Sequence, residues 1–97
     1  MLSKIDGKVL VTGAAGFIGS AVAERLASEN ISVLGVDNLN SYYDVRLKQD
    51  RLERIRNSKG SKNFEFIELN IRDKKNVDFL FKKNYFNFII HLAAQAG

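Results

Sequence analysis

The sequence predicts an α/β fold built on a parallel β-sheet, and two observations carry this prediction. Short apolar segments typical of buried strands alternate with segments of helical period, in the order β-α-β-α-β-α-β. A glycine-rich segment also lies between the first apolar segment and the first helix. Consecutive strands joined by helices form parallel sheets with right-handed crossovers. With 97 residues, 45% of them hydrophobic, we expect one small domain with one core.

Four segments are predicted as strands. Residues 8–12 (KVLVT) and 32–37 (SVLGVD) are apolar without polar alternation, as expected of strands covered on both faces. Residues 64–69 form the third strand, in which Phe and Glu alternate imperfectly, and residues 88–92 (FIIHL) form the fourth. If the strand order is 3-2-1-4, ligands bind at the switch point between the first and fourth strands, outside their carboxyl ends.

The first predicted helix spans residues 17–29. Its apolar stripe has helical spacing and consists of Ile18, Val22 and Leu26, with Ala21 and Ala27 nearby. Asn30 is expected to end the helix, because Asn tolerates the left-handed conformation common just past a helix C-terminus.

Two further helices follow. The second runs from residue 43 to about residue 57, and its many charges around Leu47, Leu52 and Ile55 indicate a surface helix. Residues 57–63 (NSKGSKN) form a polar turn. Asp73 can cap the third helix, whose expected buried side consists of Val77, Leu80 and Phe81.

The glycine-rich segment has the spacing of a dinucleotide-binding turn. Gly13 can adopt the positive φ of a tight turn, Gly16 lets backbone N–H groups approach a pyrophosphate, and Gly19 allows close helix packing. The N-terminus of the following helix then faces the phosphates. A P-loop is excluded because Ser20 directly follows Gly19 with no Lys between them. The pattern therefore predicts a Rossmann-like sheet, with a glycine-rich turn without ligand as the alternative.

A carboxylate is expected at the end of the second strand. Asp37 lies about twenty residues after the glycine turn, where it can accept hydrogen bonds from the adenosine ribose hydroxyls. It would repel a 2′-phosphate, so NAD is preferred over NADP. Asn38 can support the ribose or the adenine. The alternative is that both are ordinary turn residues at a strand end.

Composition restricts the partners and the location. The chain contains no cysteine, which excludes disulfides and thiolate metal sites. Its first seven residues lack the apolar segment of a secretory signal, and no run approaches the roughly 18 apolar residues of a membrane span. We therefore expect a cytoplasmic location and no membrane partner.

The segment after the second strand is basic, which also suits nucleic acid. Acidic residues interrupt it, however, and favour a solvated helix face over a nucleic-acid interface; they are Asp44, Asp50 and Glu53. We therefore expect no nucleic-acid partner. His91 is interpreted as a packed core residue near the end of an apolar strand rather than as an acid/base group.

Three segments together carry a family resemblance. The glycine spacing, GVDN at residues 35–38 and HLAAQAG at residues 91–97 resemble extended short-chain dehydrogenase/reductases that act on nucleotide sugars. Within that group, residues 37–47 (DNLNSYYDVRL) look most like UDP-glucuronate 4-epimerases. UDP-glucose 4-epimerases and nucleotide-sugar dehydratases are the alternatives within the group.

The resemblance implies an NAD site and a UDP-sugar substrate. It implies that the pyrophosphate is lined by Gly13, Gly16, Phe17, Ile18 and Gly19, the adenosine ribose by Asp37 and Asn38, the adenine by Asn70 and Ile71, and the nicotinamide-side ribose by Leu92, Ala93 and Ala94. Asn70 stands where the family usually has an aspartate. Residues 95–97 would approach the sugar nucleotide, whereas Tyr42 and Tyr43 would either pack on the adenine or shield the loop.

Catalysis in the family depends on a Tyr-x-x-x-Lys pair that this sequence lacks. There the tyrosine takes the proton of the sugar 4-hydroxyl while hydride passes to NAD, and the hydride returns to the other face of the 4-keto sugar. Tyr42, Tyr43 and Tyr85 are each followed four residues later by a residue other than Lys. We therefore expect residues 1–97 to be a truncated, N-terminal part of an NAD-binding Rossmann domain that is inactive alone.

The first hypothesis for the function is the cofactor-binding part of an epimerase that serves polysaccharide precursor synthesis. Two alternatives remain. One is a stand-alone nucleotide-binding module, and the other is a nucleic-acid-binding α/β domain. The glycine turn and Asp37 favour the first two hypotheses over the third. We also expect self-association through the fourth strand, because an apolar strand without a neighbour leaves unpaired N–H and C=O groups at its edge.

Overall fold

The predicted parallel sheet is confirmed, including its strand order. The computed structural model describes residues 7–39 and 45–93. Its strands are β1 (Lys8–Thr12), β2 (Ser32–Asp37), β3 (Phe64–Glu68) and β4 (Phe86–His91). They form one sheet in the order β3-β2-β1-β4, in which every neighbouring pair is parallel.

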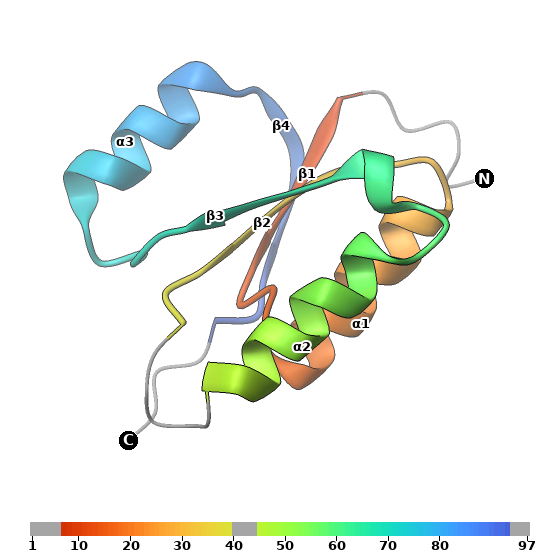
Figure 1. The fold of residues 1–97 in the computed structure, drawn as a ribbon. Helices are drawn as coiled ribbons and strands as arrows, with labels where there is room; N and C mark the ends of the chain where they lie inside the picture. The colour runs from red at the N-terminus through yellow and green to blue at the C-terminus, as the bar shows by residue number, and fades with distance from the viewer. Residues whose placement is uncertain (1–6, 40–44, 94–97) are drawn as a thin grey trace.

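Helices cover both faces of the sheet. α1 (Phe17–Ser28) and α2 (Val45–Arg56) lie side by side on one face, and α3 (Lys74–Lys83) lies on the other (Figure 1). A short 3-10 helix, η2 (Ser61–Asn63), falls within the predicted polar turn and leads into β3. The chain therefore crosses the sheet between β3 and β4, which places the switch point between β1 and β4.

The core has one layer on each side of the sheet. Alternate residues of β1 point to opposite faces, so Val9 and Val11 pack toward α1 and Leu10 packs toward α3. The layer beneath α1 and α2 also contains Ala14, Ala23, Ala27, Ile31, Val33 and Ile55. The layer beneath α3 also contains Leu34, Val36, Leu69 and Leu80.

The predicted apolar stripe of α1 is confirmed in part: Ala27 is buried and Leu26 packs against the core, but Ile18 and Ala21 are exposed. Its buried residues are small, namely Gly19, Ser20, Ala23 and Ala27, whereas Ile18 is exposed and Leu26 is partly buried. Small side chains let the helix approach closely, so volume rather than hydrophobicity decides which face turns inward. The left-handed residue expected after the helix is confirmed, because Asn30 has φ 65°.

α3 also differs from its prediction at one position. Leu80 is buried and Val77 is partly buried, as predicted, but Phe81 is exposed. Phe81 instead meets the ring of Phe86 edge to face, with the ring centroids 5.4 Å apart. The predicted cap is confirmed, since Asp73 accepts a hydrogen bond from the backbone N–H of Asn76.

β4 starts two residues earlier than predicted and forms an edge of the sheet. Lys8 pairs with Phe86 and Val9 with Phe88, so the register shifts at Asn87 and the strand extends past this irregularity. Two apolar side chains of β4 remain largely open to solvent: Phe88 is 55% exposed and Ile89 is 53% exposed. Within the described residues, no helix is long and apolar enough to cross a membrane.

Candidate functional site

The carboxyl ends of the four strands meet along one edge of the sheet. Thr12 at the end of β1 is level with Val36 of β2 and with His91 of β4. Asp37 at the end of β2 is level with Glu68 of β3. The glycine turn follows β1 at this edge, so it lies beside the residues that follow the other strands.

The glycine turn is tight and closed by its own backbone. Gly13 has φ 72°, the positive value that the sequence predicts, and the N–H of Gly16 donates to the carbonyl of Gly13 over 3.0 Å. Gly19 lies directly over the turn. A Cβ at Gly19 would overlap the carbonyl oxygen of Gly13 and would lie 2.7 Å from its carbonyl carbon, so this contact requires glycine.

The N-terminus of α1 emerges from this turn without a side-chain cap. Gly16 is the N-cap residue, and its carbonyl accepts the first helical hydrogen bond, from the N–H of Ser20 at 2.9 Å. The N–H groups of Phe17, Ile18 and Gly19 therefore have no partner within the helix. The first turn carries no acidic residue. Such a helix start favours an anion.

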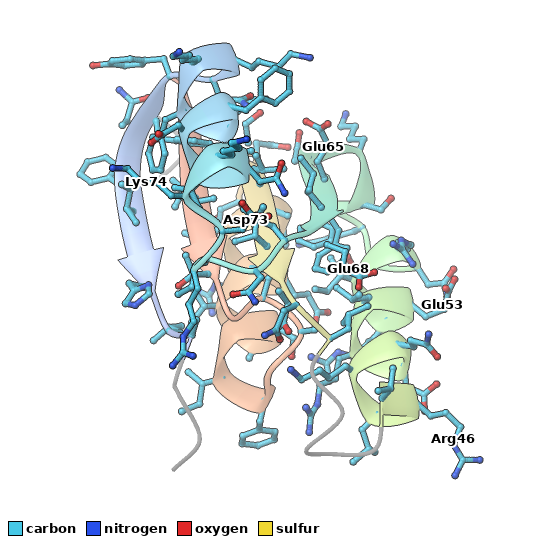
Figure 2. The ribbon with its side chains drawn as sticks, turned by 90° about the vertical axis from the view of Figure 1, so that its left-hand side faces the viewer. Arg46, Glu53, Glu65, Glu68, Asp73 and Lys74 are labelled. Atoms are coloured by element: carbon cyan, nitrogen blue, oxygen red, sulfur yellow. The ribbon has the colours of Figure 1, made fainter. Side chains whose placement is uncertain are left out.

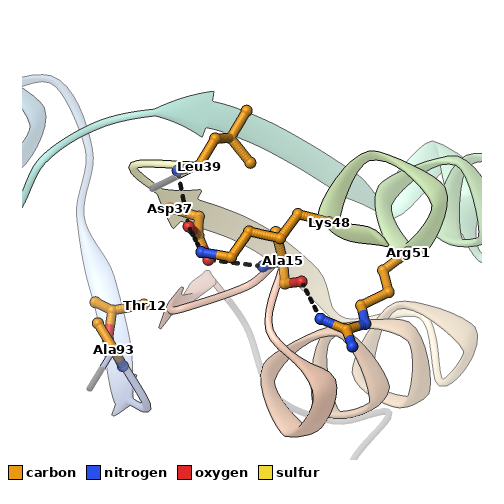
Figure 3. A network of polar contacts seen from close by, with 7 residues as sticks. All are labelled: Thr12, Ala15, Asp37, Leu39, Lys48, Arg51 and Ala93. Carbon is orange, nitrogen blue, oxygen red and sulfur yellow. Dashed lines mark hydrogen bonds and ion pairs between the residues drawn. The ribbon is translucent and has the colours of Figure 1, made fainter. Parts of the chain in front are cut away.

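Asp37 is buried at the end of β2 and is fixed by two backbone donors (Figure 3). Its Oδ2 accepts from the N–H of Ala15 over 3.1 Å, and its Oδ1 accepts from the N–H of Leu39 over 2.9 Å. The N–H of Ala14 also donates to the carbonyl of Val36, at 3.1 Å. The carboxylate is thus hydrogen-bonded to the glycine turn.

Two cations of α2 reach the same edge, and the sequence reasoning did not single out either. The Nζ of Lys48 lies 2.8 Å from Oδ1 of Asp37. Arg51, one turn later, donates from Nη1 to the carbonyl of Ala15 over 3.3 Å and lies over the ring of Phe17. Their spacing of three residues on a helix that follows β2 is a signal that could have found them, because such residues share a helix face.

Other basic residues of α2 have acidic neighbours away from this edge. Arg54 lies 3.0 Å from Glu24 of α1, and Arg56 lies 3.6 Å from Glu53. Figure 2 shows Arg46 and Glu53 projecting away from the body of the molecule. Residues 42 and 43, for which the sequence suggested an adenine contact or a shielding role, lie outside the described residues.

The residues expected beside the adenine follow β3, next to Asp37. The N–H of Leu69 donates to the carbonyl of Asp37 over 2.9 Å, which brings Asn70 and Ile71 to this edge. Both side chains are exposed, as is Asn38. The side-chain oxygen of Asn70 accepts from the N–H of Arg72 over 2.9 Å, so one of its acceptor sites stabilises the local turn.

Leu92 and Ala93 follow β4 and are tied to the end of β1. The hydroxyl of Thr12 accepts from their two N–H groups, at 3.0 and 3.2 Å, and lies 2.7 Å from Nδ1 of His91. His91 is exposed, so its interpretation as a packed core residue is wrong. β4 is an edge strand, and the sequence segment alone did not show which of its faces is covered. Ala94 lies outside the described residues.

The structure thus brings the predicted residues of the glycine turn, of the β2 end, of the β3 end and, apart from Ala94, of the β4 end to one edge of the sheet. Within residues 7–39 and 45–93, no three His, Asp or Glu side chains are grouped as a metal site would need. The edge offers backbone N–H groups, a buried carboxylate and two cations, a combination suited to a phosphate-containing ligand with hydroxyl groups.

Comparison with known proteins gives close relatives. A model described as the NAD dependent epimerase/dehydratase family matches residues 9–97. The chain is 47% identical over 91 residues to UDP-glucuronate 4-epimerase from Thermodesulfobacterium geofontis, a match that covers 94% of this chain and 27% of that protein. The chain thus spans about a quarter of the length of this relative.

Solved structures agree with this family. UDP-glucose 4-epimerase from Thermotoga maritima, solved with UDP-glucose, matches with a TM-score of 0.71 and 36% identity, over 92% of this chain and 25% of that one. UDP-glucose 4-epimerase from Stenotrophomonas maltophila, solved with NAD and formylated UDP-arabinopyranose, matches with a TM-score of 0.75 and 30% identity, over 94% and 25%. The chain belongs to the NAD-dependent epimerase/dehydratase family, whose cofactor is NAD.

Proposed function

We propose that this chain binds NAD as the cofactor-binding part of a nucleotide-sugar epimerase. The observation that carries the proposal is the hydrogen bond from the N–H of Ala15 to Asp37, at 3.1 Å. It joins the turn that suits a pyrophosphate to the carboxylate that suits a ribose. A dinucleotide contains both groups one after the other, so one extended ligand can use both halves of the site.

The residues at this edge fit NAD. The tight turn at Gly13 and the uncapped start of α1 leave backbone N–H groups for a pyrophosphate. Asp37 can accept from ribose hydroxyls and would repel a 2′-phosphate, which favours NAD over NADP. We assign the pyrophosphate to Gly13, Gly16, Phe17, Ile18 and Gly19, the adenosine ribose to Asp37 and Asn38, the adenine to Asn70 and Ile71, and the nicotinamide-side ribose to Leu92, Ala93 and Ala94.

UDP-glucuronate is the proposed substrate of the whole enzyme. The identity of 47% to a UDP-glucuronate 4-epimerase supports this assignment, as does the segment at residues 37–47. NAD held at the glycine turn and Asp37 would supply reversible hydride transfer at C4 of the sugar, the chemistry that inversion at this carbon needs. UDP-glucose is the second candidate, because the solved structures with 36% and 30% identity are UDP-glucose 4-epimerases. Either activity suits polysaccharide precursor synthesis in the cytoplasm.

We further propose that residues 1–97 are the N-terminal part of the NAD-binding domain and do not catalyse epimerisation alone. The sequence supports this through its lack of any Tyr-x-x-x-Lys pair. Incubation of the chain with NAD and either UDP-glucuronate or UDP-glucose, followed by chromatography of the UDP-sugars, is expected to show no epimer. Formation of the 4-epimer above the level of a heat-denatured sample would contradict this.

Calorimetric titration with NAD tests the binding function directly. The chain is expected to bind NAD, and Asp37→Ala is expected to weaken binding by at least about tenfold, because charged hydrogen bonds to the ribose are lost. Asp50→Ala is the matched control, since it removes an exposed carboxylate of α2 and should leave the affinity unchanged. A folded chain with no affinity for NAD would refute the proposal.

The exposed edge of β4 suggests a further partner, namely a second copy of this chain. Phe88 and Ile89 are largely exposed on β4, which pairs on one side with β1 and has no second neighbour among residues 7–39 and 45–93. An edge strand of this kind offers unpaired backbone groups beside apolar side chains, which favours strand pairing between copies. We therefore propose that the isolated chain self-associates through β4.

A further inference from the structure

The ion pair between Lys48 and Asp37 lies inside the proposed NAD site. Its two atoms are 2.8 Å apart, and the side chains are 11% and 5% exposed. The pair of Arg56 with Glu53, on the same helix, is 52% and 63% exposed. Enclosed ion pairs are screened less by salt than exposed ones, so Lys48 contributes more to the charge of this site than a surface lysine would.

The carboxylate does not depend on Lys48 for its hydrogen bonds. Asp37 already accepts from the N–H groups of Ala15 and Leu39. Lys48 adds a third hydrogen bond, from Nζ to Oδ1, and is the one cation among these three donors. With Arg51 near the carbonyl of Ala15, two cations of α2 lie beside this carboxylate (Figure 3).

We propose that Lys48 is a coenzyme-specificity residue whose charge Asp37 masks. The proposal rests on the proposed NAD function. The 2′-hydroxyl of NAD can donate to Asp37, whereas the 2′-phosphate of NADP is repelled by Asp37 and attracted by Lys48 and Arg51. The preference for NAD is thus set by the carboxylate, which accepts from the ribose hydroxyl and holds Lys48 in an ion pair. Removal of the carboxylate charge leaves Lys48 free to bind a 2′-phosphate.

The alternative is that Lys48 acts only as a structural anchor for α2 and has no effect on coenzyme choice. Both accounts explain the ion pair. They differ in what happens to NADP when Asp37 is neutralised, because an anchor has no reason to attract a 2′-phosphate. The two accounts are therefore separated by a comparison of single and double variants.

Titration with NAD and with NADP tests the proposal on the purified chain. Asp37→Asn keeps the shape of the side chain. It is expected to lower the affinity for NAD and to raise the affinity for NADP by about tenfold. Adding Lys48→Ala to this variant is expected to remove the gain for NADP. Lys48→Ala alone should lower the affinity for NADP and change the affinity for NAD less. Arg56→Ala is the matched control, because it removes one cation from the far end of α2 and should leave the NAD-to-NADP ratio unchanged.

Circular dichroism and thermal unfolding establish that each variant is folded, and Asp37→Ser replaces Asp37→Asn if the latter is not. An NADP affinity of the Asp37 variant that is the same with and without Lys48 would overturn the proposal while leaving NAD binding intact. A folded parent chain that binds neither nucleotide would instead refute the NAD function, and the specificity proposal with it.

Discussion

The hydroxyl of Thr12 lies 2.7 Å from Nδ1 of His91, at the point where β1 and β4 end together. The same hydroxyl accepts from the N–H groups of Leu92 and Ala93. A hydroxyl has two lone pairs and one proton. Two backbone N–H groups donate to this oxygen, although that of Leu92 is shared with the carbonyl of Thr12. We therefore expect the hydroxyl proton to be donated to Nδ1 of His91, which leaves the proton of the neutral ring on Nε2.

This arrangement predicts the tautomer of His91. Nitrogen-15 NMR at pH 8 is expected to show the Nε2–H form in the parent chain and in Thr12→Ser, which keeps the hydroxyl. Thr12→Val keeps the shape but removes the proton donor, so the tautomer preference should weaken. We also expect Thr12→Val to lower the free energy of unfolding by about 1 kcal/mol. An unchanged ring spectrum in Thr12→Val would contradict the assignment.

Gly19→Ala is expected to destabilise the chain by about 1–3 kcal/mol, because the added Cβ would overlap the carbonyl of Gly13. Helix propensity alone predicts the opposite sign, a gain of about 1 kcal/mol. Urea unfolding followed by circular dichroism measures the difference. Ala21→Gly is the control for helix propensity, because Ala21 is exposed on the same helix. This substitution should lower the free energy of unfolding by about 1 kcal/mol. A gain in stability for Gly19→Ala would show that the turn can move.

Asp73→Ala is expected to lower the free energy of unfolding by about 1 kcal/mol. Asp73 caps α3, and its Oδ2 also accepts from the side-chain amide of Asn76 over 2.6 Å. Asp78→Ala removes an equal charge from an exposed position inside the helix and should change stability by less than about 0.5 kcal/mol. Urea unfolding measures both changes. Equal losses in the free energy of unfolding would indicate that the negative charge stabilises α3 and that the cap does not.

Ile89→Lys is expected to weaken self-association by at least about tenfold, because it sets a charge on the exposed edge strand. Sedimentation velocity over a range of concentrations measures the change. Leu47→Lys introduces the same charge at an exposed apolar residue of α2 and should leave association as it is in the parent chain. If the parent chain stays monomeric at high concentration, β4 does not pair between copies.

The sequence was sufficient for those features that depend on local pattern. The strand order and the position of Asp37 beside the glycine turn follow from alternation and spacing, and the sheet order is confirmed. The cap at Asp73 and the left-handed Asn30 are likewise local. These features involve residues a few positions apart or the order of whole elements, both of which a linear sequence displays.

Features that depend on tertiary approach were missed. Ile18 belongs to a stripe of helical period, yet it is exposed because Gly19 must reach the backbone of Gly13 and α1 turns its small residues inward. Lys48 is one of several basic residues in the segment after the second strand, and a pattern does not show which of them meets a buried carboxylate. Phe81 contacts Phe86 across the α3–β4 connection, a relation that periodicity does not encode.

The hydrogen bond between Ala15 and Asp37 implies thermodynamic coupling between the two halves of the proposed site. A substitution at Asp37 also removes one hydrogen bond to the glycine turn. The losses of binding free energy caused by substitutions at Asp37 and in the turn should therefore not be additive. A fragment such as adenosine, which would occupy the proposed ribose side, would then improve the affinity for a separate phosphate group instead of binding independently of it. A short backbone contact would in this way make two neighbouring subsites cooperative.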